Sequence, residues 1–255
     1  WTNMEYFTRL PLTHDSEKKH FELQKKVISK ADLTLTVSDS WSKEFSQLGA
    51  IRTAIVYNGF DKYNSSIETH DKFRIGHFGL FNEFRDHPGL WQALNVSFSK
   101  NQNLKEDLEI YFSGPTHKNF HKNLKSYHLD SYLNYFEWNN LEKMQKEMLK
   151  CSVLIVSQSD TKDAMGRLPA KFFEYMGTGI PIVAIGRKNS DLSKIVLKHQ
   201  CGVFLEFNKL HKLSSYLLNY YDKYLQKKIT LKDNHLDVFS WKNQAGNLID
   251  LLKNL

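Results

Sequence analysis

Short apolar runs alternate with amphipathic segments between residues 73 and 225. Runs rich in β-branched and aromatic residues predict buried strands; these are 73–79, 108–114, 132–138, 153–159, 181–186 and 202–207. Segments with helical periodicity lie between and after them; these are 86–98, 116–128, 141–151, 168–179, 190–200 and 210–225. Strands that alternate with helices favour a parallel sheet joined by crossovers. We therefore expect an α/β fold with a doubly wound, Rossmann-like parallel sheet.

A shorter series of the same kind precedes this one. Its pattern predicts a helix at 15–30, a strand at 31–38, a helix capped by Ser40 and ended by Gly49, and a strand at 54–60. Two further segments complete the pattern. The polar stretch 62–72 lacks periodicity and is typical of an interdomain linker, and 238–255 predicts a last amphipathic helix.

The stretch 166–186, GRLPAKFFEYMGTGIPIVAIG, joins two of the predicted strands through a short helix. Pro169 is expected at the first helical position, and Gly177 and Gly179 at the end. The open backbone amides and the positive dipole end at 168–170 form an anion-binding site.

Glu174 follows Pro169 by five residues, which is about 7 Å of helix. That spacing is comparable with the reach from a diphosphate to the hydroxyls of its ribose. Lys171 and Glu174 are three residues apart and share a face. The helix therefore fits a nucleotide diphosphate; the alternative is a scaffold helix with a solvated Lys171–Glu174 ion pair.

A second loop is expected opposite this helix. In an open α/β sheet, ligands bind beyond the carboxyl ends of the strands where the strand order reverses, which places the loop after Gly79 opposite the loop 157–168. Gly79 allows a phosphate to approach the backbone closely. Arg85 could clamp a diphosphate bidentately, or be an exposed loop charge. His77, in mid-strand, is expected to be a core histidine.

Composition narrows the ligand classes. The net charge of +7 and the pI near 9.1 are compatible with phosphate-bearing ligands, anionic membrane surfaces or nucleic acid. The lysines are spread along helices, so nucleic-acid binding is not required. No run of 18 apolar residues is present, and Cys151 and Cys201 at strand edges are expected to be buried thiols, which fits a cytoplasmic setting. No His, Cys or Asp cluster has metal-ligand spacing, so we expect neither a metal nor another cofactor.

The segment LPAKFFEYMGTGIPIVA (168–184) resembles the donor-binding signature of family-4 glycosyltransferases, which have the GT-B fold. The segments ADLTLTVS (31–38) and NGFD (58–61) resemble the end of the N-terminal acceptor domain of that family. The resemblance implies the C-terminal half of a GT-B fold. Its parts are an acceptor-domain remnant at 1–61, a linker at 62–72, the donor-binding domain at 73–237 and a crossover helix at 238–255 with Trp241 near its start.

The resemblance also implies roles for individual residues. Donor phosphates would lie at Gly79 and Leu168, the ribose at Glu174, and the base at the main chain of Phe136, Glu137 and Trp138. The chain itself offers Arg85 and Lys171 as cations for the phosphates, and Trp138 could stack on a base or serve in packing. The catalytic residue is expected in an upstream acceptor domain that the chain lacks.

Three positions depart from the family pattern. Relatives have an arginine directly after the glycine that corresponds to Gly79, and a lysine six residues after that arginine. This chain has Leu80 and Asp86 at these positions. Relatives also have a glutamate eight residues before the ribose-binding one, and here that residue is Gly166. Asp160 or Asp163 could replace that acid only if the loop folds back.

The expected activity is transfer of a hexosyl group from a nucleotide-diphosphate sugar to an acceptor hydroxyl, with retention, in glycan or polysaccharide biosynthesis. The acceptor would be a glycan or a lipid-linked molecule, with peripheral membrane contact left open and no nucleic acid as partner, and the chain alone is expected to be inactive. Three alternatives stay open: a GT-B nucleotide-sugar epimerase, a non-catalytic nucleotide-binding or partner module, and a nucleic-acid binder whose affinity depends strongly on salt.

Overall fold

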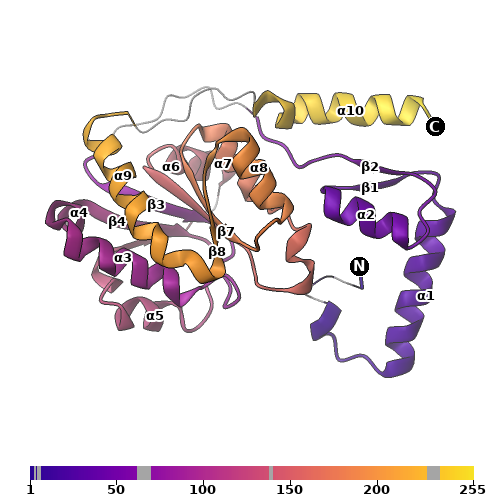
Figure 1. Ribbon diagram of the computed structural model, residues 1–255, viewed down its shortest axis with the longest axis horizontal. Coiled ribbons are helices and arrows are strands. Elements are labelled where there is room, and N and C mark those ends of the chain that lie inside the picture. Colours follow the sequence, from indigo (N-terminus) through magenta and orange to yellow (C-terminus); the bar gives the residue numbers. More distant parts are fainter. Residues whose placement is uncertain (3, 5–6, 62–69, 138–139, 229–235) are drawn as a thin grey trace.

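The computed structural model describes residues 1–2, 4, 7–61, 70–137, 140–228 and 236–255. Its larger part is built on one six-stranded sheet (Figure 1). The strands are β3 (Phe73–Phe78), β4 (Leu108–Ser113), β5 (Leu133–Phe136), β6 (Val153–Ser157), β7 (Ile182–Gly186) and β8 (Gly202–Glu206). Their order is β5-β4-β3-β6-β7-β8 and every pair is parallel, which confirms the predicted α/β sheet.

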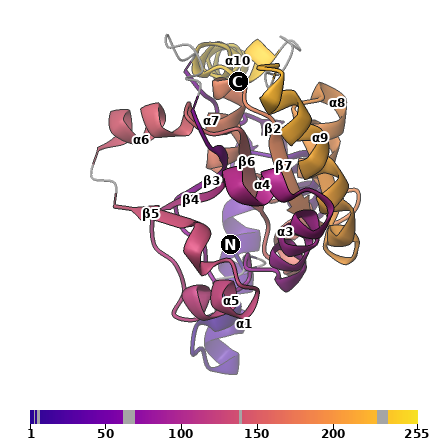
Figure 2. The same cartoon turned by 90° about the vertical axis from the view of Figure 1, so that its left-hand side faces the viewer.

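Helices cover both faces of this sheet (Figures 1 and 2). The core on one face receives residues from α3 (Pro88–Lys100), α4 (Gln102–Asp107), α5 (Phe120–Ser126) and α9 (Leu213–Leu225). The core on the other face receives residues from α6 (Leu141–Met148), α7 (Ala170–Thr178) and α8 (Asp191–His199). Strands β3, β6 and β7 are buried along their whole length because a parallel sheet is covered on both sides.

The N-terminal part carries a separate two-stranded parallel sheet. Its elements are α1 (His14–Lys30), β1 (Thr34–Thr36), α2 (Asp39–Gln47) and β2 (Thr53–Ile55). Helix α10 (Trp241–Lys253) lies beside this part (Figure 1). The Tyr57 N–H donates to Gln244 Oε1 at 2.7 Å, and the Trp241 N–H donates to the Phe60 carbonyl at 3.0 Å. The last helix is therefore hydrogen-bonded to the strand region that ends the N-terminal part.

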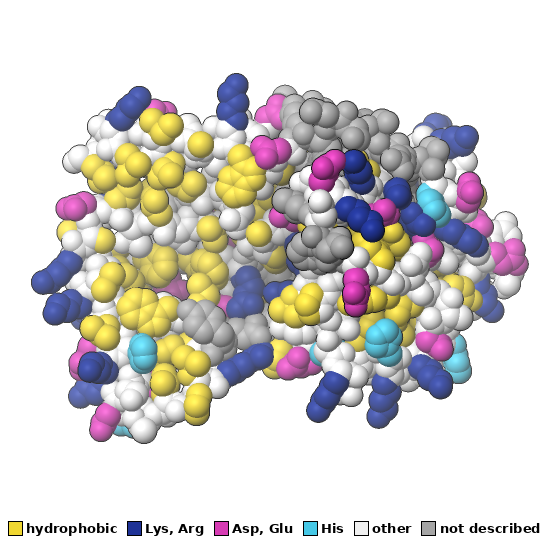
Figure 3. Space-filling model, turned by 180° about the vertical axis from the view of Figure 1, so that it is seen from behind, with side chains coloured by type: hydrophobic (Ala, Val, Ile, Leu, Met, Phe, Trp, Pro, Cys, Tyr) yellow, Lys and Arg dark blue, Asp and Glu magenta, His cyan; other side chains and the backbone are white. Residues whose placement is uncertain are grey.

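Hydrophobic side chains gather on the surface of the N-terminal part and α10 (Figure 3). Exposed apolar residues there are Phe21, Leu23, Val27, Leu35, Ile51, Ile249, Leu252 and Leu255. Among the described helices, none is both long and apolar enough to cross a lipid bilayer.

Two helix starts differ from the sequence expectation, and one short helix was not predicted. Ser38, not Ser40, caps α2, and its hydroxyl accepts the Trp41 N–H at 3.4 Å. Pro169 is the N-cap of α7 with an extended ψ of 134°, so the helix proper begins at Ala170. Helix α4 was not predicted because its six residues are nearly all polar; its local signal is the Asn101 side chain, which caps it.

Both cysteines are free and buried, as predicted. Burial raises the pKa of the Cys201 thiol to about 12, so this group stays protonated at neutral pH. The thiols therefore belong to the packing of the sheet.

Candidate functional site

The strand order reverses between β3 and β6, at the centre of the sheet. The chain runs outward from β3 to β5 and then returns to β6, so the two loops that follow β3 and β6 meet. The Ser157 hydroxyl donates to the Arg85 carbonyl at 2.8 Å, and His87 Nε2 lies 3.0 Å from the Gln158 carbonyl. The predicted opposition of these loops is confirmed.

The buried side chain of Gln158 shapes the loop between β6 and α7. Its amide nitrogen donates to the Ala164 carbonyl at 3.1 Å and to the Arg167 carbonyl at 2.6 Å. Its Oε1 lies 3.4 Å from the Arg187 N–H. Sequence reasoning missed this residue, although a glutamine directly after an apolar strand is a signal that its amide needs buried partners.

Helix α7 is held against the end of β3 by Tyr175, which is fully buried. The tyrosine hydroxyl accepts the Phe78 N–H at 2.8 Å and lies 3.3 Å from the Phe78 carbonyl. The contact fixes α7 beside β3, and Lys171 in the first turn of α7 also reaches the end of this strand. The first amides and the dipole at the N-terminal end of the helix favour an anion.

Two glycines end β3 and β4 side by side. Gly79 and Gly114 have φ values of +105° and +107°, which other residues rarely adopt. A Cβ on Gly114 would lie 2.7 Å from Gly79 Cα, and a Cβ on Gly79 would lie 3.0 Å from Lys171 Nζ. The missing side chain of Gly79 therefore leaves the space in which the lysine ammonium lies.

Lys171 reaches from α7 to the end of β3. Its Nζ lies 3.2 Å from His77 Nε2 and 3.4 Å from the Leu80 carbonyl. The side chain thus points to the strand end, and the alternative of a solvated pair with Glu174 is not what this geometry shows. Burial, together with the nearby Arg85, lowers the pKa of Lys171 to about 7, although Glu174 acts in the opposite direction.

His77 is buried between aromatic rings, as expected of a core histidine. Its ring stacks on Phe112 at 5.1 Å and meets the edge of Phe81 at 4.8 Å. Burial, with Lys171 nearby, holds the pKa of His77 well below its usual value. Nδ1 lies 3.1 Å from the Ile155 carbonyl, and the Leu80 carbonyl also lies within reach of the ring. Because a carbonyl only accepts, the contact with Ile155 is one that a protonated Nδ1 can make.

The other predicted phosphate and ribose residues lie around this lysine. Arg85 donates from Nη1 to the Leu80 carbonyl at 2.8 Å, and it is close enough to Lys171 to affect its pKa. Glu174 is partly buried on α7, and burial raises its pKa although Lys171 opposes this. The Leu168 side chain is buried in the core, so only its backbone remains for a ligand.

The predicted base-binding residues are more dispersed. The Phe136 ring stacks on Tyr111 with centroids 4.9 Å apart and is part of the core boundary. Glu137 is exposed after the end of β5, and Trp138 lies outside the described residues.

The Asp86 side chain is buried. Its carboxylate accepts hydrogen bonds from Trp91 Nε1, from His117 Nε2 at 2.6 Å and from Asn123 Nδ2 at 2.7 Å. Asp86, which stands where relatives have a lysine, thus links the loop after β3 and the loop after β4. Sequence reasoning missed this link because its partners lie more than thirty residues apart in the chain.

Gly166 packs against the N-terminal part. A Cβ at this position would lie 2.3 Å from Trp41 Cδ1, so the indole occupies the space that a side chain would need. Asp163, which follows β6, accepts from Thr161 Oγ1 at 2.6 Å and pairs with Arg167. The idea that Asp163 folds back to supply the missing acid is therefore not supported by its contacts.

Asp160, the other proposed substitute for the missing acid, pairs with Arg187 at 2.8 Å.

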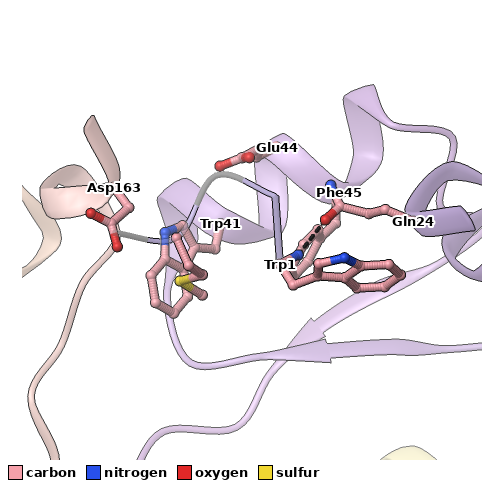
Figure 4. A pocket seen from close by; sticks show the side chains of 7 residues that line it. Trp1, Gln24, Trp41, Glu44, Phe45 and Asp163 are labelled. Carbon is pink, nitrogen blue, oxygen red and sulfur yellow. Dashed lines mark hydrogen bonds between the residues drawn. The ribbon is translucent and has the colours of Figure 1, made fainter. Parts of the chain in front are cut away.

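A cavity of about 20 Å³ lies where the N-terminal part meets the loop after β6 (Figure 4). Trp41, Glu44 and Asp163 line it together with Trp1. Burial raises the pKa of Glu44, the N-terminal ammonium opposes this, and the neighbouring Asp163 adds to the rise.

Within the described residues, no group of three or more His, Cys, Asp or Glu side chains could hold a metal ion. The charged groups near the reversal point include Lys171, Arg85 and Glu174. They can bind a polyanion and hydroxyl groups next to it.

Neither a family model nor a curated protein sequence matches the chain. Solved structures do match it in three dimensions. TarM superposes with a TM-score of 0.70 at 13% identity over 98% of this chain and 48% of its own. Anabaena Alr3699/HepE in complex with UDP-glucose superposes with a TM-score of 0.71 at 18% identity, over 93% of this chain and 68% of its own.

The pneumococcal O-GlcNAc transferase GtfA in complex with UDP and GlcNAc superposes with a TM-score of 0.65 at 10% identity, over 92% of this chain and 47% of its own. The chain spans about half the length of TarM and GtfA. At sequence identities of 10%, 13% and 18%, similarity between structures shows a shared fold only. The chain therefore has the Rossmann-like fold of the C-terminal part of GT-B glycosyltransferases.

Proposed function

We propose that the chain is the donor-binding half of a glycosyltransferase that uses a nucleotide-diphosphate sugar. The observation behind the proposal is the convergence of the α7 N-terminus, Gly79 and the Lys171 ammonium at the reversal point of the sheet. Glu174 follows on the same helix at the spacing that a ribose requires. The structures of Anabaena Alr3699/HepE with UDP-glucose and of GtfA with UDP and GlcNAc add support from proteins of the same fold.

In the proposed reaction, the bond between the anomeric carbon and the diphosphate oxygen breaks, and a bond to an acceptor hydroxyl oxygen forms. The hydroxyl proton is lost to a base, and the electron pair leaves with the nucleoside diphosphate. The α7 amides and the Lys171 and Arg85 cations would stabilise the negative charge on this leaving group. The chain would thus contribute positioning and electrostatic stabilisation.

The finer assignments extend the same proposal. We propose a hexosyl donor, retention at the anomeric carbon, and a glycan or lipid-linked acceptor in glycan or polysaccharide synthesis. Because protein cations face the phosphate site, donor binding should be unaffected by EDTA. The domain divisions at residues 61, 72 and 237 belong to this proposal as well.

A second candidate is a nucleotide-binding module without transferase activity. It is favoured by the Trp41 indole against Gly166, where the family pattern has an acid. Both candidates bind a nucleoside diphosphate, and only the transferase transfers or hydrolyses the sugar.

The test is a thermal-shift screen of nucleoside diphosphates against the matching nucleosides. At a ligand concentration 100 times Kd, binding stabilises the folded state by about 2.7 kcal/mol. We expect one diphosphate to raise Tm and its nucleoside to do so far less. If no diphosphate or nucleotide sugar changes Tm at millimolar concentration, the proposal is wrong.

A further inference from the structure

His77 uses both ring nitrogens although it lies in an apolar layer. Its faces contact Phe112 and Phe81, and Nδ1 is directed at the Ile155 carbonyl on the neighbouring strand. A carbonyl only accepts, so the contact with Ile155 assigns the proton of the neutral ring to Nδ1 and the lone pair to Nε2. The Leu80 carbonyl also lies within reach of the ring, and it accepts from Lys171 Nζ at 3.4 Å in this arrangement. Nε2 lies 3.2 Å from Lys171 Nζ and can accept one of its protons.

The partners of Lys171 are chemically unusual for a buried lysine. Its two nearest acceptors, His77 Nε2 and the Leu80 carbonyl, are neutral. A carboxylate at the same distance would neutralise the ammonium, whereas a neutral imidazole orients it and leaves its charge available to an anion. The other charged groups that act on it are Arg85 from the loop after β3 and Glu174 from α7.

The direction of the ammonium is also restricted by the backbone. Lys171 Nζ lies 3.0 Å from the place a Gly79 Cβ would take, so it is directed over the glycine at the end of β3. The same glycine and the first turn of α7 form the proposed phosphate site.

From these contacts we infer that His77 is a positioning residue, which holds the Lys171 ammonium over Gly79 so that it can bind the diphosphate of the donor. This inference rests on the proposed function. His77, a core residue, would thus contribute to phosphate recognition through Lys171.

A dependence on pH follows from the same arrangement. The pKa of Lys171 is lowered to about 7, and a bound diphosphate would raise it again. Above pH 7, diphosphate affinity should therefore decrease up to tenfold per pH unit, because a proton must be taken up on binding. The affinity for the nucleoside should not follow this profile.

The first experiment needs no ligand. ¹⁵N NMR of the ligand-free protein should show His77 as the neutral Nδ1–H tautomer, and Lys171→Met should shift its Nε2 resonance. A proton on Nε2, or an Nε2 resonance unchanged in Lys171→Met, would overturn the inference.

The second experiment compares diphosphate with nucleoside affinity in three variants. His77→Phe keeps the ring packing and removes the acceptor, and we expect the preference for diphosphate to fall about tenfold. His77→Gln keeps an acceptor at similar reach and should retain most of the preference. Phe112→Leu disturbs the same packing without removing a polar atom, and it should leave the preference unchanged.

An unchanged preference in His77→Phe would overturn the inference, as would an equal loss in Phe112→Leu. If the wild type binds no nucleoside diphosphate, the proposed function fails, and the NMR result still decides whether His77 holds Lys171. Should His77→Phe not fold, the affinities of His77→Gln and the NMR measurements decide whether the inference holds.

Discussion

We propose that Glu174 is a binding residue rather than a structural one. Burial raises the pKa of its carboxyl above 4.5, so the ionised form is less favourable in the folded protein than in the unfolded chain. Such a group lowers stability at neutral pH, and the native contacts of Lys171 lie elsewhere, at His77 and Leu80. Two vicinal ribose hydroxyls would supply the hydrogen bonds that the carboxylate can accept.

We predict that Glu174→Gln weakens ribonucleoside diphosphates by about 1.5–3 kcal/mol, because charged hydrogen bonds are lost. Binding of 2′,3′-dideoxy diphosphates should change much less. The variant should also be no less stable than the wild type. Calorimetric titration with both ligands checks this, with Glu142→Gln on exposed α6 as the matched control. Equal discrimination between the two ligands in variant and wild type would remove Glu174 from the site.

Lys171 allows a prediction on stability and pH. Its pKa is near 7 in the folded protein and near 10.5 in the unfolded chain. The protonated lysine therefore lowers the free energy of unfolding as pH falls below 10.5, and the full decrease is reached below about pH 7. Lys171→Met should therefore raise Tm relative to the wild type at pH 6, and this difference should shrink towards pH 10. Lys146→Met, on the exposed face of α6, should give a small difference that does not depend on pH in this way. A Lys171→Met difference that grows from pH 6 to pH 10 would contradict the account.

At the scale of elements, local sequence patterns predict the strands of the sheet but not the contacts between its loops. The runs that became β3, β6 and β7 are apolar throughout, which is the pattern of strands buried on both faces. Gly79 and Gly179 marked the end of a strand and of a helix, and both have positive φ. By contrast, the Asp86 contacts and the packing of Trp41 on Gly166 join residues far apart in sequence, and no periodic pattern encodes them.

The same distinction applies to the site. Helix geometry predicted that the α7 N-terminus and Glu174 lie on one helix, and the reversal rule predicted the facing loops. The direction of the Lys171 side chain could not be predicted. It depends on the space over Gly79 and on His77, which the sequence pattern predicts only as a core residue.

We predict that Asp86→Ala lowers the free energy of unfolding by about 3–5 kcal/mol. The substitution leaves the Trp91, His117 and Asn123 donors without their buried acceptor. Urea denaturation measures the effect, with the exposed Asp32→Ala as the control. A loss no larger than that of the control would show that Asp86 does not link the two loops.

At the scale of the whole molecule, the N-terminal part contacts the larger part of the chain at several places. The Ser40 N–H donates to Asp191 Oδ2 at 2.7 Å, at the start of α8. Trp41 follows and packs against Gly166, just before α7. Basic side chains lie around the hollow between the two parts in the view from behind (Figure 3). The position of α2 therefore determines how much space remains beside the proposed donor site.

We predict that Gly166→Glu is strongly destabilising in the wild type and much less so in Trp41→Ala, because the indole fills the space of the new side chain. The coupling free energy of the double-mutant cycle should be about 1–3 kcal/mol. Urea denaturation of the four proteins measures it. Additive effects would mean that Trp41 does not exclude a side chain at this position.

The central claim is that the α7 N-terminus and Lys171 bind the diphosphate of a nucleotide. Its most direct measurement is a calorimetric titration of nucleoside, monophosphate and diphosphate of the same base into the wild type and Lys171→Met. We expect affinity to rise with each phosphate in the wild type, and the gain from nucleoside to diphosphate to shrink by about 1.5–3 kcal/mol in the variant. Equal affinity for nucleoside and diphosphate in the wild type, or an equal gain in both proteins, would contradict the account.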